Sequence, residues 1–348
     1  MEYRFDEIAY NSTAKKLPED SDRQYYIGLE HLDSNSLYVS RWGSDVTPVG
    51  EKLLMKKGDV LFGKRRAYQR KVGIAPFDGI FSAHGMVLRP KENVMDTSYF
   101  PFFISSDQFM ERAVRISVGG LSPTINWKDL KEQVFDIPTL EEQKTLASKL
   151  WAAYKLREEY KRLLTATDEM VKSRFIEMFG NPVTNTKKWS TEPLEIVAPE
   201  SPSEERELGQ VWILNLDMIE SQSGRVIEKV YDCSDNLNSV SPFDKGNVLF
   251  SKLRPYLNKV VIPDGNGYAT TELVPLRPKE TKVKRTFLAY LLRSDEFVGF
   301  ADSIATGTKM PRMPMQALRS FECILPPIQL QEEFIEVAEQ ADKSKYLS

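Results

Sequence analysis

The chain is poor in the residues that build redox and metal sites. Its 348 residues include two histidines and two cysteines, and Cys233 lies far from Cys323 in the sequence. This favours a reducing environment and argues against a disulfide framework or a zinc site. No window reaches the roughly 18 consecutive apolar residues of a membrane span, and the first residues lack the pattern of a signal peptide. We therefore expect a cytoplasmic protein with no membrane contact.

Motifs of well-known enzymes are missing as well. The sequence has no Gly-rich cofactor loop after a strand, no Asn/Asp-Pro-Pro-Tyr/Phe motif of amino-methyltransferases and no G-x-x-x-x-G-K-[ST] loop for ATP. His31 and His84 have no cysteine or carboxylate at metal-ligand spacing. We therefore expect no catalytic residue, metal or cofactor on this chain. A nuclease site made of two carboxylates is not excluded, because Asp and Glu occur throughout.

Charge is unevenly distributed along the chain. The net charge of −3 does not indicate a nucleic-acid binder, but one face can be basic while another is acidic. Between Lys56 and Lys71 there are seven positive side chains and a single acidic one, Asp59. This segregation is more informative than the net charge.

The sequence contains an internal repeat whose two copies stay in one register, with Lys57 aligned on Lys245. KGDVLFGKRRAYQRKV at 57–72 aligns with KGNVLFSKLRPYLNKV at 245–260, and ten of the 16 positions are identical. Unrelated segments would share roughly one. LRPKE also occurs at both 88–92 and 276–280, in the same register. The repeat predicts two homologous domains.

A long helical segment follows each copy. Residues 139–179 contain no proline, and their apolar residues recur at steps of three and four, which predicts an amphipathic helix of roughly 60 Å. Glu141 and Glu142 favour its N-terminus, and Gly180-Asn181-Pro182 ends it. A helix this long needs a partner. The second copy supplies a shorter one, from Ile328 to about Tyr346.

The shorter second helix leaves two expectations open. In the first, the shorter helix packs on the N-terminal part of the long helix, and the protein is functional with this one shortened helix. Alternatively, an exposed apolar stripe around Leu163, Met170 and Phe175 recruits a second copy of the chain or a helix of another subunit.

Each copy is predicted to be an α+β domain. Val60–Phe62 and Val248–Phe250 are expected strands that follow Lys-Gly turns, and residues 73–88 are expected to form hairpin strands. Residues 98–116 and 285–304 have the pattern of amphipathic helices that carry aromatic side chains. The predicted organisation is a first domain, a central helix, a second domain and a short C-terminal helix, at residues 1–138, 139–180, 181–326 and 327–348.

The sequence also resembles a known family. Its most specific motif is GGLSPTINWKDLKEQVFDIPTLEEQKTLASKL at 119–150, and the first helical segment ends with K..FIEMFGNP. With these features the chain resembles the specificity subunit of type I restriction–modification enzymes over essentially its whole length. The resemblance implies two target recognition domains, each reading one half of a bipartite site in double-stranded DNA. It also implies that the spacer helices pair as an antiparallel coiled coil.

The same resemblance implies partner proteins. DNA methyltransferase subunits, which methylate adenine, are expected to dock on the helices, and a restriction subunit joins them. S-adenosylmethionine, ATP and magnesium are then expected on those subunits and none on this chain. Two alternatives remain open: a coiled-coil interaction scaffold, and a stand-alone nuclease or methyltransferase, against which the missing motifs argue.

Two kinds of segment are candidate DNA contacts. The first is the pattern K.R.Y..K, because affinity for DNA comes largely from Lys and Arg that neutralise phosphates. The alternative for this basic segment is a solvated loop beside a strand. The candidate residues are Lys64, Arg65, Arg66, Tyr68, Arg70 and Lys71 in the first copy and Lys252, Arg254, Tyr256 and Lys259 in the second.

The second segment is the loop before Pro123 and Pro311. Glycine allows close backbone approach, and Ser, Thr and Lys side chains donate to phosphates or base edges; the alternative is a simple turn between a helix and a strand. The candidates are Gly119, Gly120, Ser122, Thr306, Gly307, Thr308, Lys309 and Arg312. Side chains that read bases should differ between the copies, and the sequence offers as guesses Gln69, Asn126, Asn258 and Arg312.

Overall fold

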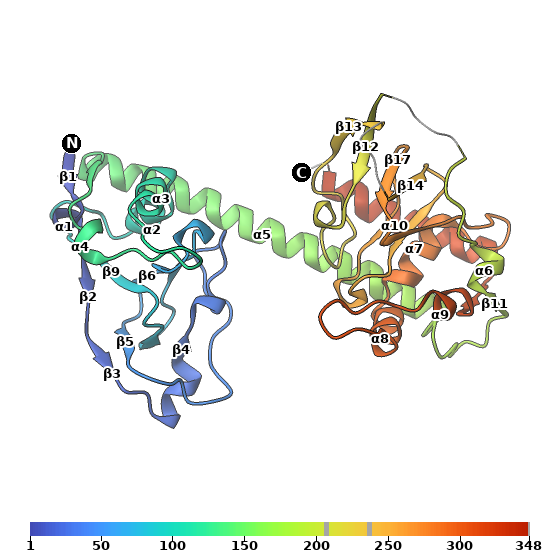
Figure 1. Ribbon diagram of the computed structural model, residues 1–348, viewed down its shortest axis with the longest axis horizontal. Helices are drawn as coiled ribbons and strands as arrows, with labels where there is room; N and C mark the ends of the chain where they lie inside the picture. Colours follow the sequence, from blue (N-terminus) through green and yellow to red (C-terminus); the bar gives the residue numbers. More distant parts are fainter. Residues whose placement is uncertain (205–208, 235–238, 347–348) are drawn as a thin grey trace. The chain divides into compact units, whose positions relative to one another are not determined.

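The computed structural model describes residues 1–204, 209–234 and 239–346 (Figure 1). The chain forms two compact units, Met1–Glu159 and Tyr160–Ser348. One helix, α5 (Leu140–Phe179), runs through the boundary, so each unit contains about half of it. The domain boundaries expected at 138, 180 and 326 stay predictions, and residues 347–348 at the end of the expected C-terminal helix lie outside the described residues.

Two four-stranded sheets form the body of the first unit. Their strand orders are β2-β9-β6-β7 and β3-β5-β8-β4, and every neighbouring pair is antiparallel except β4 with β8. The strands are β2 (Ala9–Ser12), β3 (Lys15–Lys16), β4 (Tyr26–Ile27), β5 (Lys52–Met55), β6 (Val60–Phe62), β7 (Val72–Ile74), β8 (Gly79–Phe81) and β9 (Met86–Pro90).

The strand expected at Val60–Phe62 is confirmed, but the expected hairpins over residues 73–88 are wrong. β7, β8 and β9 exist, yet none of them pairs with another of the three. The turn after β7 carries the chain into the other sheet, where β8 pairs with β4 and β5. The chain then returns to the first sheet, where β9 pairs with β2 and β6. Turn residues show that the chain reverses there, but they do not identify the strand beside which it continues.

Short helices and aromatic rings complete the first unit. The helical segment expected at 98–116 is broken at Ser106, whose side chain accepts a hydrogen bond from the backbone N–H of Phe109 (3.2 Å) and caps the second part. Phe5 lies at the centre of the core and contacts the rings of Phe103 and Phe135. The remaining elements are β1 (Glu2–Arg4), α1 (Phe5–Ile8), α2 (Phe100–Ser105), α3 (Asp107–Arg115), α4 (Trp127–Leu130) and β10 (Val134–Asp136), and β1 pairs with β10.

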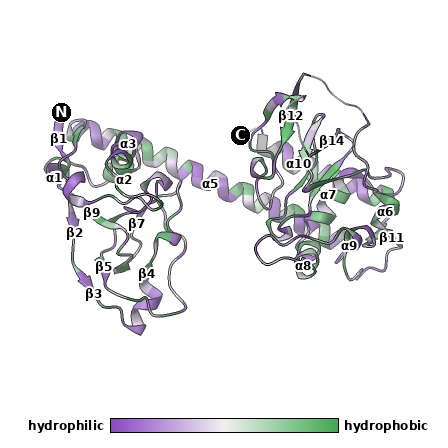
Figure 2. Cartoon of the chain, viewed as in Figure 1, coloured by the Kyte–Doolittle hydropathy of each residue, from purple (hydrophilic) through white to green (hydrophobic). Residues whose placement is uncertain are grey.

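The second unit repeats this arrangement. Its sheets have the orders β13-β12-β17-β14 and β16-β15-β18, the expected strand at Val248–Phe250 is confirmed as β15, and Figure 2 shows β12 as strongly hydrophobic. The strands are β11 (Thr191–Pro193), β12 (Gln210–Leu214), β13 (Val230–Cys233), β14 (Val240–Phe243), β15 (Val248–Ser251), β16 (Val260–Val261), β17 (Gly267–Thr270), β18 (Leu273–Leu276) and β19 (Glu322–Ile324). The helices are α6 (Leu194–Val197), α7 (Arg285–Arg293), α8 (Asp295–Ser303), α9 (Met315–Arg319) and α10 (Ile328–Tyr346). Both units are therefore α+β, as predicted, and their sheets are open.

Helix α10 packs against the end of α5 and runs antiparallel to it. The Phe334 ring, near the start of α10, lies 5.3 Å from Phe175 and 5.6 Å from Phe179, near the end of α5. Further along α10, Asp342 lines one pocket together with Asp168 of α5. This confirms the antiparallel pairing over the second half of α5. It corrects the expectation that the short helix packs on the N-terminal part of the long one.

The exposed stripe expected on α5 is also only partly correct. Phe175 is 1% exposed because the second unit covers it, whereas Leu163 and Met170 are 60% and 54% exposed. Apolar spacing along a helix identifies the residues that are stabilised by burial. It does not show which of them are buried by the chain itself.

A buried glutamine fixes the start of each long helix. In the first unit, the Gln143 side chain accepts a hydrogen bond from the backbone N–H of Asp96 (2.8 Å). Its amide nitrogen donates to the carbonyl oxygens of Val94 and Pro138, both at 2.9 Å. The equivalent partners of Gln331 in the second unit are Lys284, Lys282 and Pro326, at 2.9, 3.0 and 2.9 Å.

Within residues 1–204, 209–234 and 239–346, no helix combines the length and the apolar character needed to cross a membrane.

Candidate nucleic-acid interface

The basic segment of each unit forms a tight turn with a strained backbone. In the first unit, Arg66 and Arg70 have φ angles of 55° and 54° and flank a single 3-10 turn, η3 (Ala67–Gln69). In the second unit, Arg254 and Asn258, both with φ of 49°, flank η6 (Pro255–Leu257) in the same way. The left-handed conformation costs a residue other than glycine about 1–2 kcal/mol. Strain of this kind, kept in both units, is typical of functional sites.

The loop before each proline is a small hairpin. In the first unit, Val118 and Thr124 exchange two backbone hydrogen bonds of 3.0 and 2.9 Å. In the second unit, Thr306 and Arg312 exchange two of 2.9 Å. Gly119 and Gly307 directly follow Val118 and Thr306. Their φ angles are 112° and 106°, values that only glycine adopts readily. The expected glycine-dependent turn is therefore present in both units.

Backbone hydrogen bonds join the turn to the hairpin. The N–H of Arg66 donates to the carbonyl oxygen of Pro123 at 2.7 Å, and Arg254 donates to Pro311 at the same distance. We call the combined structure the turn–hairpin surface. It comprises residues 64–70 and 117–124 in the first unit, and residues 252–258 and 305–312 in the second. Two segments that the sequence offered as separate candidates thus form one surface in each unit.

In the first unit, this surface presents cations around an exposed hairpin tip. Arg65, Arg66 and Tyr68 are exposed, and Arg66 Nε donates to Ser122 Oγ at 3.2 Å. Lys64 is half-buried, and burial lowers the pKa of its ammonium group. The surface is thus strongly cationic, and its rigid backbone limits how its charges can move.

In the second unit, the exposed cations lie mainly on the hairpin. Lys309 and Arg312 are exposed, while Lys252 and Arg254 on the turn are half-buried. Arg254 Nη2 donates to the carbonyl oxygen of Lys309 at 3.4 Å. The remaining candidates, Tyr256, Thr306, Gly307 and Thr308, lie exposed on the same surface.

Two predicted phosphate contacts are instead engaged inside the protein. Lys71 Nζ donates to the carbonyl oxygen of Leu29 at 2.7 Å. Lys259, its repeat equivalent, donates to Leu216 at 2.5 Å, and burial lowers the pKa of Lys259. Both lysines tie the turn to a neighbouring 3-10 helix, so we leave them out of the proposed DNA contacts.

The residues that end the two turns also hold the turn in place. Arg70 Nη2 forms an ion pair with Asp107 (2.6 Å) and donates to the carbonyl oxygen of Ser105 (3.1 Å). The buried Asn258 donates from Nδ2 to the carbonyl oxygen of Arg293 (2.9 Å), at the repeat equivalent of Ser105. Asn258 is 2% exposed, so the guess that it reads bases is wrong.

Replacing Lys71 by methionine tests its internal role. The variant keeps the aliphatic stem but loses the hydrogen bond to Leu29, so we expect the first unit to lose about 1 kcal/mol of stability. Because no phosphate contact is lost, the salt dependence of DNA binding should not change. Urea unfolding and a salt titration of DNA affinity measure the two effects, and a shallower salt dependence would show that Lys71 contacts DNA.

Two of the other three guesses for base reading, Gln69 and Asn126, lie at the edge of the surface and stay untested. Gln69 is half-buried within η3, and Asn126 is exposed immediately before α4, with its Nδ2 at 3.5 Å from Asp129. Asn126 also lies directly beyond the hairpin in the sequence, next to the buried Ile125. Both remain candidates on the edge of the surface.

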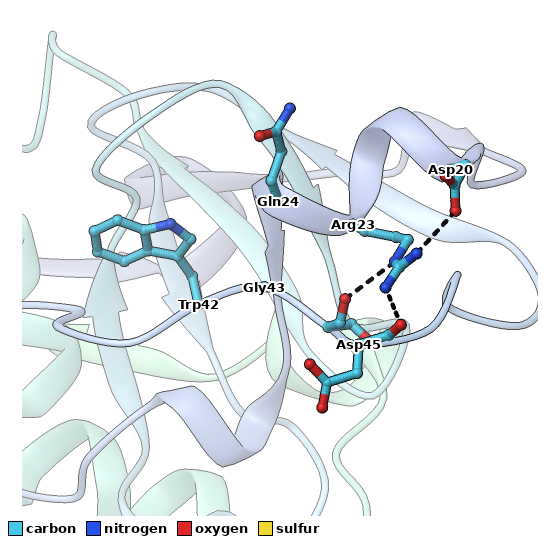
Figure 3. Close-up of a pocket in the computed structure, with 7 residues that line it drawn as sticks. Asp20, Arg23, Gln24, Trp42, Gly43 and Asp45 are labelled. Atoms are coloured by element: carbon cyan, nitrogen blue, oxygen red, sulfur yellow. Dashed lines mark hydrogen bonds and ion pairs between the residues drawn. The ribbon is translucent and has the colours of Figure 1, made fainter.

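An open hollow elsewhere in the first unit has a different character (Figure 3). It has a volume of about 560 Å³ and lies beside Trp42 and Gln24. Arg23 spans it by an ion pair with Asp20 (3.2 Å) and a hydrogen bond to the carbonyl oxygen of Ser44 (3.2 Å). Because the cation is already held by these oxygens, this hollow is a poorer phosphate site than the turn–hairpin surface.

Among the residues that the structure describes, no group of three or more His, Cys, Asp and Glu side chains is placed to hold a metal ion.

Known proteins resemble this chain in sequence and in fold. Residues 8–164 match the family described as type I restriction modification DNA specificity domain. The EcoDI type I restriction enzyme specificity subunit of Escherichia coli is 24% identical over 206 residues, which cover 57% of this chain and 45% of that protein. The match thus spans less than half the length of this curated relative.

One solved structure shares the fold, and a second has a lower TM-score. The S subunit of a type I restriction–modification system from M. genitalium superposes with a TM-score of 0.53 at 13% identity, covering 100% of this chain and 90% of that one. A chain from a structure titled for complex assembly and conformational transition of the type I R-M system has a TM-score of 0.49 at 17% identity, covering 100% and 92%. The resemblance of this chain to type I specificity subunits, predicted from its sequence, is therefore confirmed by the family match over residues 8–164 and by the Escherichia coli relative.

Proposed function

We propose that this chain recognises DNA sequence for a type I restriction–modification complex, with each unit binding one half of a bipartite site. The observation that carries the proposal is the turn–hairpin surface, which both units build with the same backbone hydrogen bonds. The first unit supports it further, because its family is defined by DNA specificity. Differences between the side chains of the two surfaces would allow the two halves of the site to differ.

Binding by such a surface would separate into two tasks. Exposed cations such as Arg65 and Arg66 would neutralise phosphates and release counterions, which supplies affinity without sequence preference. The hairpin tips, with Gly119 and Gly307, would bring backbone and short side chains close to the bases, where sequence is read. The strained turn would hold the arginines in position before DNA arrives.

The proposal extends to the partners. Methyltransferase subunits that modify adenine would dock on the helices, and a restriction subunit would complete a cytoplasmic complex. S-adenosylmethionine, ATP and magnesium would bind those subunits, and this chain would contribute recognition and no catalytic group. The exposed Leu163 and Met170 on α5 would meet a helix of a partner subunit or of a second copy.

Salt dependence of DNA affinity tests the surface. We expect Lys64→Gln with Arg66→Gln to weaken binding and to reduce the slope of log affinity against log salt by about 0.9 for each lost phosphate contact. Lys252→Gln with Arg254→Gln should do the same in the second unit. The measurement is a titration of duplex DNA at several salt concentrations, with the chain assembled with its methyltransferase subunits.

A matched control uses lysines of the same repeat. Lys57 and its equivalent Lys245 are exposed and precede strands β6 and β15, whereas the turn follows those strands. Lys57→Gln with Lys245→Gln removes the same type of charge and should leave the salt slope nearly unchanged. Equal slopes for the surface variants and the wild type would favour the interaction scaffold over DNA recognition.

A further inference from the structure

The two turn–hairpin surfaces share a backbone, and among the positions at which the units differ, one lies on the hairpin and another lies beside the turn. In the first unit, these positions hold His84 and Thr124. In the second unit, the equivalent positions of the repeat hold Glu272 and Arg312. The backbone N–H of Lys252 donates to the carbonyl oxygen of Glu272 (3.0 Å), so this glutamate lies directly beside the basic turn.

Glu272 holds Arg312 by one edge of its guanidinium group. Arg312 Nε lies 3.1 and 3.2 Å from the two carboxylate oxygens, and Nη2 lies 2.8 Å from one of them. Glu272 is 22% exposed and Arg312 46% exposed, so the pair is open to a ligand. Within the described part of the chain, no hydrogen bond or ion pair to Nη1 is found. The outer edge of the guanidinium group, formed by Nη1 and Nη2, can therefore donate hydrogen bonds to another molecule.

A carboxylate beside this surface needs an explanation. Hydrogen bonding to Arg312 lowers the pKa of Glu272, so the carboxylate is ionised at neutral pH. If the surface only neutralised phosphates, a negative charge next to it would weaken binding. A carboxylate that orients an arginine has a different use, because a guanidinium fixed in one plane is suited to bidentate recognition.

A guanidinium edge held in one plane is complementary to guanine. Arginine donates two parallel hydrogen bonds to O6 and N7 of guanine in the major groove, and this contact discriminates strongly against other bases. We propose that Arg312 reads a guanine in the half-site of the second unit and that Glu272 is the positioning residue that orients it. This inference rests on the proposed DNA-recognition function. The first unit has Thr124 at the equivalent position, so it reads its half-site differently.

Selection from random duplexes tests the pair. The chain, assembled with its methyltransferase subunits, is used to enrich bound sequences, and the wild type should yield a bipartite motif with a guanine at a fixed place in one half. We expect Arg312→Ala and Arg312→Lys to lower the preference for that guanine by about tenfold or more, while the rest of the motif stays unchanged. The lysine variant keeps the charge, so it separates base reading from general affinity.

Glu272→Gln distinguishes positioning from simple electrostatics. Loss of a negative charge should strengthen binding to random duplex DNA, yet a loosened Arg312 should reduce the preference for the same guanine. Variants of the Arg319–Glu200 ion pair, which lies outside the turn–hairpin surface at similar exposure, serve as the control and should leave the motif intact. Circular dichroism establishes that every variant is folded.

The outcomes separate the two proposals. If the wild type enriches a motif that Arg312→Ala and Arg312→Lys leave unchanged, the base-reading pair is wrong and the DNA-recognition function stands. If Arg312 variants lose the guanine but Glu272→Gln does not, the positioning role of Glu272 is wrong. If the wild type enriches no sequence at all, the proposed function fails and the pair fails with it.

Discussion

Replacing Phe334 by alanine is expected to destabilise the second unit by about 3–5 kcal/mol, the usual cost of removing a buried phenylalanine ring. Phe334 is fully buried. Its ring lies 5.3 Å from Phe175 and 5.6 Å from Phe179, both of α5, and 5.1 Å from Tyr290 of α7. One ring thus joins α10, α5 and α7, and its loss leaves a cavity where the three helices meet. Urea unfolding of the full chain, followed by circular dichroism, measures the change.

The repeat provides the control for this experiment. Leu146 occupies the equivalent position of the repeat in the first unit, but it is 38% exposed. Leu146→Ala removes fewer buried contacts, so it should cost less than about 1 kcal/mol. If both alanine variants lost the same stability, the difference in burial between the two units would have no energetic meaning, and the packing of α10 on α5 would be in doubt.

Leu146 and Phe334 show what helical periodicity predicts and what it does not. The spacing of apolar residues identified both long helices and their approximate ends, because an amphipathic helix repeats on the scale of one turn. It did not identify the part of α5 on which α10 packs, since Leu146 and Phe175 fit the same apolar stripe. In the structure, α10 meets the phenylalanines near the end of α5.

The candidate interface was predictable in part for a similar reason. The repeat located both basic turns and both hairpins, because selection of the same local backbone leaves the same glycines, prolines and cations. It did not separate Arg66, which is exposed, from Lys71, which donates to Leu29. That partner lies 42 residues away along the chain, and no local pattern encodes the contact.

Two residues with specific roles were missed although the repeat contained a signal for them. Gln143 and Gln331 are identical at equivalent positions of the repeat, yet glutamine in a helix is usually exposed and attracts little notice. Glu272 carries no signal of this kind, because its counterpart is His84 and the repeat marks only what the copies share. Under the proposed function, in which the two units recognise different sequences, paired differences such as Glu272 with Arg312 are as informative as identities.

Replacing Gln331 by leucine is expected to lower the stability of the second unit by about 3 kcal/mol, because each buried polar group left without a partner costs about 1–3 kcal/mol. Gln331 is fully buried, and its loss leaves the N–H of Lys284 and the carbonyl oxygens of Lys282 and Pro326 without this partner. Leucine is of similar size, so lost hydrogen bonds and not a cavity dominate the effect. Urea unfolding of the full chain measures the change in free energy.

Gln329 provides the control on the same helix, because it is exposed and lies two residues earlier. Gln329→Leu changes the same chemistry at the surface and should shift stability by less than about 0.5 kcal/mol. Gln143→Leu should reproduce the large loss in the first unit, where the same three hydrogen bonds recur. Equal, small effects of Gln331→Leu and Gln329→Leu would contradict the anchoring role. A large loss at both Gln143 and Gln331 would instead show that each long helix is fixed to its unit at its first turns, as the proposed recognition of a bipartite site requires.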